Sequence, residues 1–83
     1  LRGVDLSGCR LRETSLVGTD LRKSVLSGAD LRGARTSEAR LDDADLRGAI
    51  ADPSLWTTAS LTGARIDVSQ GLAFALAHGL RLD

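Results

Sequence analysis

A period of five residues governs the hydrophobic and polar positions along most of this 83-residue chain. Read from one leucine to the next, the chain runs LRGVD LSGCR LRETS LVGTD and keeps this phase, without insertion or deletion, from Leu1 to Ile66. The centres depart from leucine or isoleucine at Thr36, Ala51 and Trp56. We assign these centres to a buried core column: Leu6, Leu11, Leu16, Leu21, Leu26, Leu31, Leu41, Leu46, Trp56, Leu61 and Ile66.

A second column of small side chains lies two positions before each centre, from Val4 to Ala64, and it includes Cys9. Two positions after the centre, glycine is frequent, as at Gly3 and Gly8. Glycine tolerates the torsions of a tight corner. The pattern therefore indicates two inward columns and one corner in each repeat.

Neither a helix nor a continuous strand accommodates this period. A helix of 3.6 residues per turn would scatter the leucines around its axis, and a strand would send them to alternate faces. The pattern predicts a backbone that turns once per repeat, so that four repeats close a square coil and coils stack about 4.8 Å apart. The predicted fold for residues 1–66 is an all-β solenoid, a filled rod without a catalytic pocket.

The segment IADPSLW departs from the pattern while keeping its phase. We expect the coil to continue there with one distorted side and with Pro53 at a corner. Trp56 is expected to fill the space beside Ala51, and the alternative is an exposed binding anchor.

Residues 67–83 carry the signature of a helix. Asp67 and Gln70 are placed as a capping box and Gly79 can end the helix, so the spacing predicts a helix from about Val68 to His78. Its apolar residues either all cap the last coil, or cap with one side and form a C2 homodimer with the other. The candidates for the dimer interface are Val68, Leu72, Phe74, Leu76 and Leu80.

Composition narrows the function classes. Charged residues make up 27% and apolar residues 42% of the chain, which is typical of a soluble, cytoplasmic domain without a membrane segment. The single cysteine, Cys9, is expected to be a buried inert thiol, and the single histidine, His78, a helix-end residue. Disulfides, metal sites, cofactors and catalysis are not expected, because no nucleophile, phosphate loop or zinc pattern is present in the sequence.

The charges are balanced overall but sorted along the chain. Residues 1–40 hold eight basic and five acidic side chains, a balance of +3, whereas residues 41–67 hold two basic and five acidic ones, a balance of −3. These aspartates either bind a basic protein surface or only solvate the rod, pairing with basic residues one coil below, as Arg22 with Asp42, Lys23 with Asp43 and Arg32 with Asp52. The candidate binding residues are Asp42, Asp43, Asp45, Asp52 and Asp67.

The repeats GADLRGAR, DDADLRGA and TASLTGAR resemble those of the pentapeptide repeat proteins. The longer runs GCRLRETSLVGTDLRKSVLSGADLRGAR and DPSLWTTASLTGARIDV, with the tail AFALAHGLRL, resemble the carboxyl half of mycobacterial members linked to fluoroquinolone resistance. This resemblance implies a right-handed quadrilateral β-helix and a homodimer formed through the carboxyl-terminal helix. It also implies that the chain is a fragment of a DNA mimic that inhibits DNA gyrase and lessens fluoroquinolone action, without binding nucleic acid. The alternative is a structural or protein-interaction solenoid with no topoisomerase target.

Overall fold

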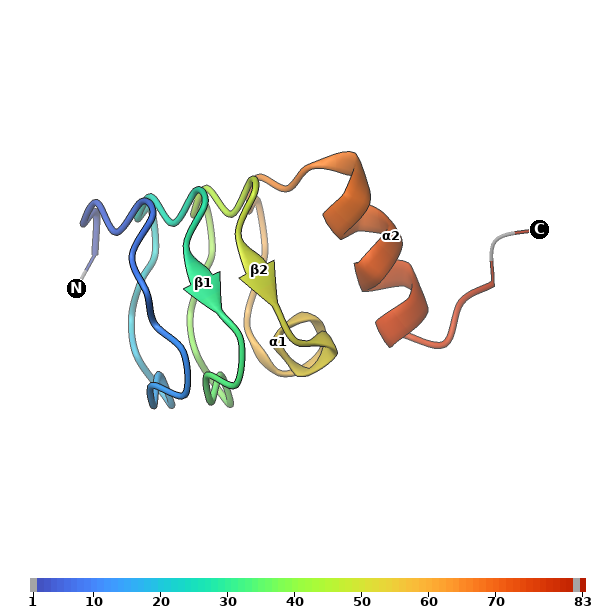
Figure 1. The fold of residues 1–83 in the computed structure, drawn as a ribbon, viewed down its shortest axis with the longest axis horizontal. Coiled ribbons are helices and arrows are strands. Elements are labelled where there is room, and N and C mark those ends of the chain that lie inside the picture. The colour runs from blue at the N-terminus through green and yellow to red at the C-terminus, as the bar shows by residue number, and fades with distance from the viewer. Residues whose placement is uncertain (1, 82) are drawn as a thin grey trace.

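The chain forms a stack of square coils closed at its carboxyl end by a helix (Figure 1). The computed structural model describes residues 2–81 and 83, so Leu1 of the expected column lies outside the described residues. In chain order the elements are β1 (Asp30–Leu31), β2 (Ile50–Ala51), α1 (Pro53–Thr58) and α2 (Val68–Ala77). Their overall extents are 39 × 21 × 20 Å, which makes a short rod.

Backbone pairing gives each coil twenty residues, as the five-residue period predicts. Asp5 pairs with Val25 and Val25 pairs with Asp45, always in parallel, and β1 pairs with β2 in the same register, Asp30 opposite Ile50. Inter-coil hydrogen bonds repeat at seven of the centres, from Leu6 to Leu46, for example from the Leu6 amide to the Val25 carbonyl at 2.7 Å. The β-helical stacking is thereby confirmed, and its right-handed sense stays a prediction.

The corners lie two residues after each centre. Glycines such as Gly28 and Gly48 have positive φ angles there, and four other residues adopt the same left-handed conformation at equivalent corners: Glu13, Lys23, Glu38 and Asp43, with φ between 58° and 63°. A non-glycine residue is disfavoured in this region by about 1–2 kcal/mol. The coil geometry therefore overrides local preference at these positions.

The inner columns are buried in the middle of the rod. Leu21, Leu26, Leu41 and Leu46 have at most 2% of their surface exposed, and the small residue Ala44 between them is fully buried. Leu6, Leu11, Leu16 and Leu61 are only half-buried, because they belong to the outer coils. Cys9 is half-buried as well, so the expectation of a fully buried thiol was wrong.

Two parts of the expected column need correction. Ile66 is 38% exposed rather than buried, because the last coil ends there and α2 covers it only in part. Residues 53–58 form the helix α1 rather than a distorted coil side, with Pro53 in its first turn. Proline suits the first turn of a helix, where its missing N–H is not required. Helix α1 buries Trp56, as expected, and also Leu55, which lies outside the predicted column.

Candidate interaction surface

Helix α2 lies across the end of the coil stack (Figure 1), and Gln70 is the buried polar residue that attaches it there. The predicted capping box is confirmed: the Asp67 carboxylate accepts from the Gln70 amide at 2.8 Å, and Gln70 Oε1 accepts from the Asp67 amide at 3.0 Å. Gln70 Nε2 also donates to the carbonyls of Leu46 and Ala49. The bond to the Ala49 carbonyl takes the place of the one that a following coil gives, as the Arg65 amide gives to the Ala44 carbonyl.

The inner face of α2 packs on α1. Phe74 meets Trp56 edge to face, with ring centroids 6.4 Å apart, and a nitrogen of the His78 ring lies 2.9 Å from the Trp56 carbonyl oxygen. A carbonyl accepts but cannot donate, so His78 Nε2 carries the proton in this bond. Phe74, expected in a dimer interface, therefore belongs to the capping face.

The outer face of α2 is apolar and uncovered. Val68 is 91% exposed, Leu72 43%, Leu76 56% and Leu80 58%. Helix α2 ends in a Schellman motif, in which Gly79 has φ +78° and the Leu80 amide donates to the Ala75 carbonyl at 2.9 Å. Leu80 therefore lies just beyond the last turn, and the exposed large apolar side chains within α2 itself are Val68, Leu72 and Leu76.

The five candidate aspartates do not form one uniform patch. Asp52 accepts from the Gly33 amide at 2.7 Å and Asp67 accepts from the Gly48 amide at 2.9 Å, where a following coil would place backbone carbonyls. Hydrogen bonds from backbone amides hold the pKa of Asp67 below its usual range. Asp52 and Asp67 thus have a structural role in closing the coil, which the sequence analysis missed.

Asp45 is engaged by an arginine of its own coil. Arg47 Nη2 lies 2.7 Å from Asp45 Oδ2 and its Nε donates to the other carboxylate oxygen at 2.9 Å. This hydrogen bonding lowers the pKa of Asp45 to about 2. The arrangement recurs at Asp30 with Arg32, so pairing within a coil is a property of the repeat.

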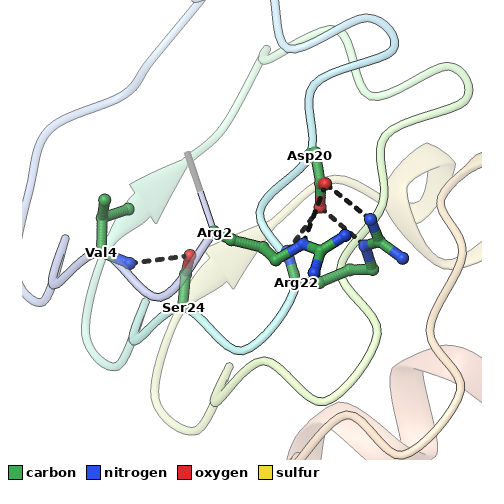
Figure 2. A network of polar contacts seen from close by, with 5 residues as sticks. All are labelled: Arg2, Val4, Asp20, Arg22 and Ser24. Atoms are coloured by element: carbon green, nitrogen blue, oxygen red, sulfur yellow. Dashed lines mark hydrogen bonds and ion pairs between the residues drawn. The ribbon is translucent and has the colours of Figure 1, made fainter.

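The ion pairs along the rod differ from the expected pairs, which joined each aspartate to a basic residue one coil below. Figure 2 shows Asp20 held by Arg22 from its own coil and by Arg2 from the coil before it, with the inner bond from the Val4 amide to the Ser24 hydroxyl nearby. Within residues 2–81 and 83, the ion pairs join Asp20, Asp30 and Asp45 to arginines. None of the expected pairs Arg22–Asp42, Lys23–Asp43 and Arg32–Asp52 is among them. Arg22 and Arg32 instead pair with Asp20 and Asp30, two positions earlier in the same coil.

Asp42 and Asp43 form an acidic corner in which the two side chains differ in their contacts. Asp42 Oδ1 accepts from the Ser60 hydroxyl at 2.5 Å and from the Thr62 amide at 3.1 Å. Asp43 is exposed, and in the described part of the chain its side chain has neither an ion pair nor a hydrogen bond. Its carboxylate lies next to Gly63, which leaves room for it.

Surface hollows flank α2, contrary to the expectation of a rod without pockets. One of about 320 Å³ includes Ile50, Trp56 and Gln70 in its lining, and one of about 130 Å³ is lined by Trp56, Leu61, Ala64, Ile66 and Phe74. Among the described residues, no three potential ligands gather around a metal position, and no helix has the length and apolarity needed to cross a membrane.

The pentapeptide repeat family model matches residues 1–35 with eight copies of the repeat. Over this range, the five-residue repeat of the family agrees with the observed pairing of residues twenty positions apart. Residues 1–35 thus carry the repeat of the pentapeptide repeat family. A solved relative is alr5209, a pentapeptide repeat protein from Nostoc PCC 7120, with 34% identity, a TM-score of 0.51 and coverage of 78% of this chain.

Two further comparisons define how far this chain resembles other proteins. The plasmid-mediated fluoroquinolone resistance protein QnrB1 aligns over 95% of this chain with 18% identity and a TM-score of 0.42. The chain spans 58% of the length of alr5209 and 45% of that of QnrB1. A comparison with curated protein sequences found no match.

Proposed function

We propose that this pentapeptide repeat chain is part of a homodimeric DNA mimic that binds DNA gyrase, inhibits it and lessens fluoroquinolone action. The proposal extends the resemblance of its repeats and tail to the mycobacterial members linked to fluoroquinolone resistance. It requires neither a cofactor nor catalysis, and a ligand of gyrase would act in the cytoplasm.

The proposed binding to DNA gyrase rests on the acidic corner at Asp42 and Asp43. Duplex DNA presents closely spaced negative charges, so a protein surface that holds it is basic and binds in a salt-dependent way. Residues 41–67 carry a balance of −3 on a rod 20–21 Å thick. Such a rod offers carboxylates to a DNA-binding surface without the flexibility of an acidic tail.

The outer face of α2 supports the homodimer part. Large apolar side chains at a surface mark an interaction site when they are contiguous, and Val68, Leu72 and Leu76 follow one another at a spacing of four residues. A dimer through this face joins two rods end to end. It also brings the two acidic ends toward one axis, which lengthens the negatively charged surface.

Competition with DNA tests the gyrase part. Gyrase bound to labelled linear duplex DNA is titrated with this chain at two salt concentrations, and we expect displacement that weakens as salt rises. Asp43→Lys should reduce displacement at least several-fold. The fold should survive, because Lys23 occupies the equivalent corner one coil earlier with nearly the same φ.

Glu38→Lys is the matched control, because it makes the same charge change at another left-handed corner. It should displace DNA like the unmodified chain. If the two variants weaken displacement equally, net charge rather than the corner at Asp43 is responsible. Absence of displacement by the unmodified chain would refute DNA mimicry.

A protein-interaction solenoid with no topoisomerase target is the second candidate. The observation that favours it is the engagement of Asp45, Asp52 and Asp67 in contacts that stabilise the rod. In that case the acidic residues serve the fold and solubility. A gyrase supercoiling assay with a saturating amount of the chain separates the candidates, because only the DNA mimic should reduce supercoiling.

A further inference from the structure

Residues 53–58 lie on the fourth side of the last coil, where the chain leaves the repeat and forms α1. One coil earlier, Arg35 pairs with the coil before it through both its amide and its carbonyl. Leu55 is the equivalent residue in the next layer, but its amide donates to the Asp52 carbonyl and its carbonyl accepts from the Ala59 amide, both as part of the helix. The coil edge beneath α1 is therefore left without this pairing.

That edge consists of the Ala34 carbonyl and the amides of Thr36 and Glu38, which have no hydrogen-bonding partner within residues 2–81 and 83. The equivalent groups one coil earlier are all paired, as the Gly18 amide is with the Ser37 carbonyl at 3.0 Å. Ala34 and Thr36 are also buried, with 7% and 4% of their surface exposed. Buried backbone groups are nearly always paired, so a strong constraint must keep the segment in α1.

The intrinsic stability of α1 does not supply this constraint. The helix has six residues, and the side chain of its N-cap residue Asp52 makes no capping bond but accepts from the Gly33 amide. Helices this short are marginal in water unless packing supports them. The segment also keeps the phase of the coil, with small residues at Ser54 and Ala59 and with Trp56 at the centre.

The torsion angles at the corners identify the constraint. The residue two positions after the centre has a φ between 58° and 76° at every corner from Gly3 to Gly48, and again at Gly63. Pro53 occupies this position after Ala51. The proline ring holds φ near −65°, and proline has no N–H to donate to a following coil. A corner therefore cannot form at Pro53, whereas the first turn of a helix accepts it.

We propose that Pro53 is a conformational stop, which ends the coil and holds residues 53–58 in α1 although this segment retains the sequence of a coil side. The stop shapes the end of the rod, because Trp56 of α1 contacts Phe74 and His78 of the terminal helix region. Helix α1 also covers the open edge, and an uncovered edge is a template for pairing with another chain.

Leu55 favours α1 independently of the stop. In the helix it is only 2% exposed. One position before a centre, however, the side chains of a coil point outward, and the equivalent residues Ser15 and Arg35 are exposed. Releasing the stop alone would therefore expose a leucine, so a test of the stop also needs a polar residue at this position.

Replacing both residues tests the stop directly. In Pro53→Gly/Leu55→Ser, glycine can adopt the corner torsion and serine suits the outward position. We expect the Cα chemical shifts of residues 54–58 in NMR spectra to change from helical to extended values. Hydrogen exchange at the amides of Thr36 and Glu38 should slow by about tenfold or more, because both amides gain partners.

Thermal unfolding of the two single variants and the double variant measures the coupling between these positions. Leu55→Ser alone places a polar residue in the buried face of α1 and should lower Tm by roughly 10 °C or more. In the Pro53→Gly background the same change should lower Tm by about half as much or less, because the segment can turn residue 55 outward.

Ser54→Gly is the matched control, because it introduces glycine next to Pro53 and leaves the stop in place. Residues 55–58 should keep helical chemical shifts in this variant. Extended shifts there, or in Leu55→Ser alone, would overturn the proposal, since α1 would then be lost without release of Pro53. Helical shifts in the double variant, losses of Tm that simply add, or a double variant that does not fold would overturn it as well.

Discussion

Replacing Gln70 should detach α2 from the coil stack. Gln70 is 7% exposed, and its side chain makes three hydrogen bonds outside its own helix backbone: it donates to the carbonyls of Leu46 and Ala49 and accepts from the Asp67 amide. Gln70→Ala removes all three bonds. Helix α2 then keeps its packing against Trp56 of α1, the bond of His78 to the Trp56 carbonyl and the bond of Asp67 from the Gly48 amide.

The expected loss of stability follows from the hydrogen bonds that each partner of Gln70 keeps in the Gln70→Ala chain. The Leu46 carbonyl still accepts from the Ala49 amide at 3.0 Å, so its loss is small. The Ala49 carbonyl loses the bond from Gln70, and a buried unsatisfied carbonyl costs about 1–3 kcal/mol. Adding about 1 kcal/mol for the capping bond, we expect the free energy of unfolding to fall by roughly 2–4 kcal/mol.

Thermal unfolding followed by circular dichroism measures this loss. For a domain of this size, 1 kcal/mol corresponds to about 4–8 °C in Tm, so Gln70→Ala should lower Tm by roughly 10 °C or more. Ser69→Ala is the control, because Ser69 is an exposed neighbour in the same turn. A Gln70→Ala chain within about 2 °C of the unmodified one would refute the claim that this side chain closes the coil.

Two other predictions concern the corners and the ion pairs. A Cβ at Gly63 would meet the end of the Asp43 carboxylate, which is exposed and can rotate away, so Gly63→Ala should destabilise the chain by about the 1–2 kcal/mol of its left-handed φ alone. Gly18→Ala, with open space around it, measures that strain by itself, and a loss in a urea titration at Gly63 that exceeds the loss at Gly18 by more than about 1 kcal/mol would contradict this reasoning. The pKa of Asp45 is lowered to about 2 in the folded chain, so its pairing with Arg47 stabilises the fold above the unfolded pKa of about 3.9 and is lost as pH falls toward 2. Arg47→Gln should raise the Asp45 pKa in a carboxyl NMR titration and reduce the acid dependence of stability; an unchanged pKa would contradict this assignment.

The spacing of the residues was enough to predict the rod. A period of five is incompatible with either regular structure, so the coil, its corners and its two inner columns follow from backbone geometry. The capping box of Asp67 and Gln70 was equally predictable, because it is a local interaction within four residues. Leu21 and Leu46 lie at repeat centres, and they are buried because the centres in the middle of the rod point inward.

Local pattern did not predict what depends on the end of the stack. The five-residue phase of the sequence continues through Pro53, yet the chain forms α1 there. No following coil stacks on this side of the last coil, so the regular coil conformation is not required. Ile66 keeps its phase and remains partly exposed for the same reason.

The tertiary structure likewise decided the roles of the aspartates. In the sequence, Asp42, Asp45, Asp52 and Asp67 are equivalent outward charges. In the structure, Asp52 and Asp67 replace the carbonyls of a missing coil, Asp45 meets Arg47, and Asp42 binds Ser60.

The sequence by itself determined the repeating coil, because each residue there experiences the same neighbours at a fixed spacing. Only the tertiary structure decided which face of α2 caps the rod and which face remains open. That choice depends on Gln70 and Phe74 finding partners in coils more than fifteen residues away, Ala49 and Trp56. These contacts are made by α1 and α2 and not by the stacked coils, so the five-residue period does not encode them.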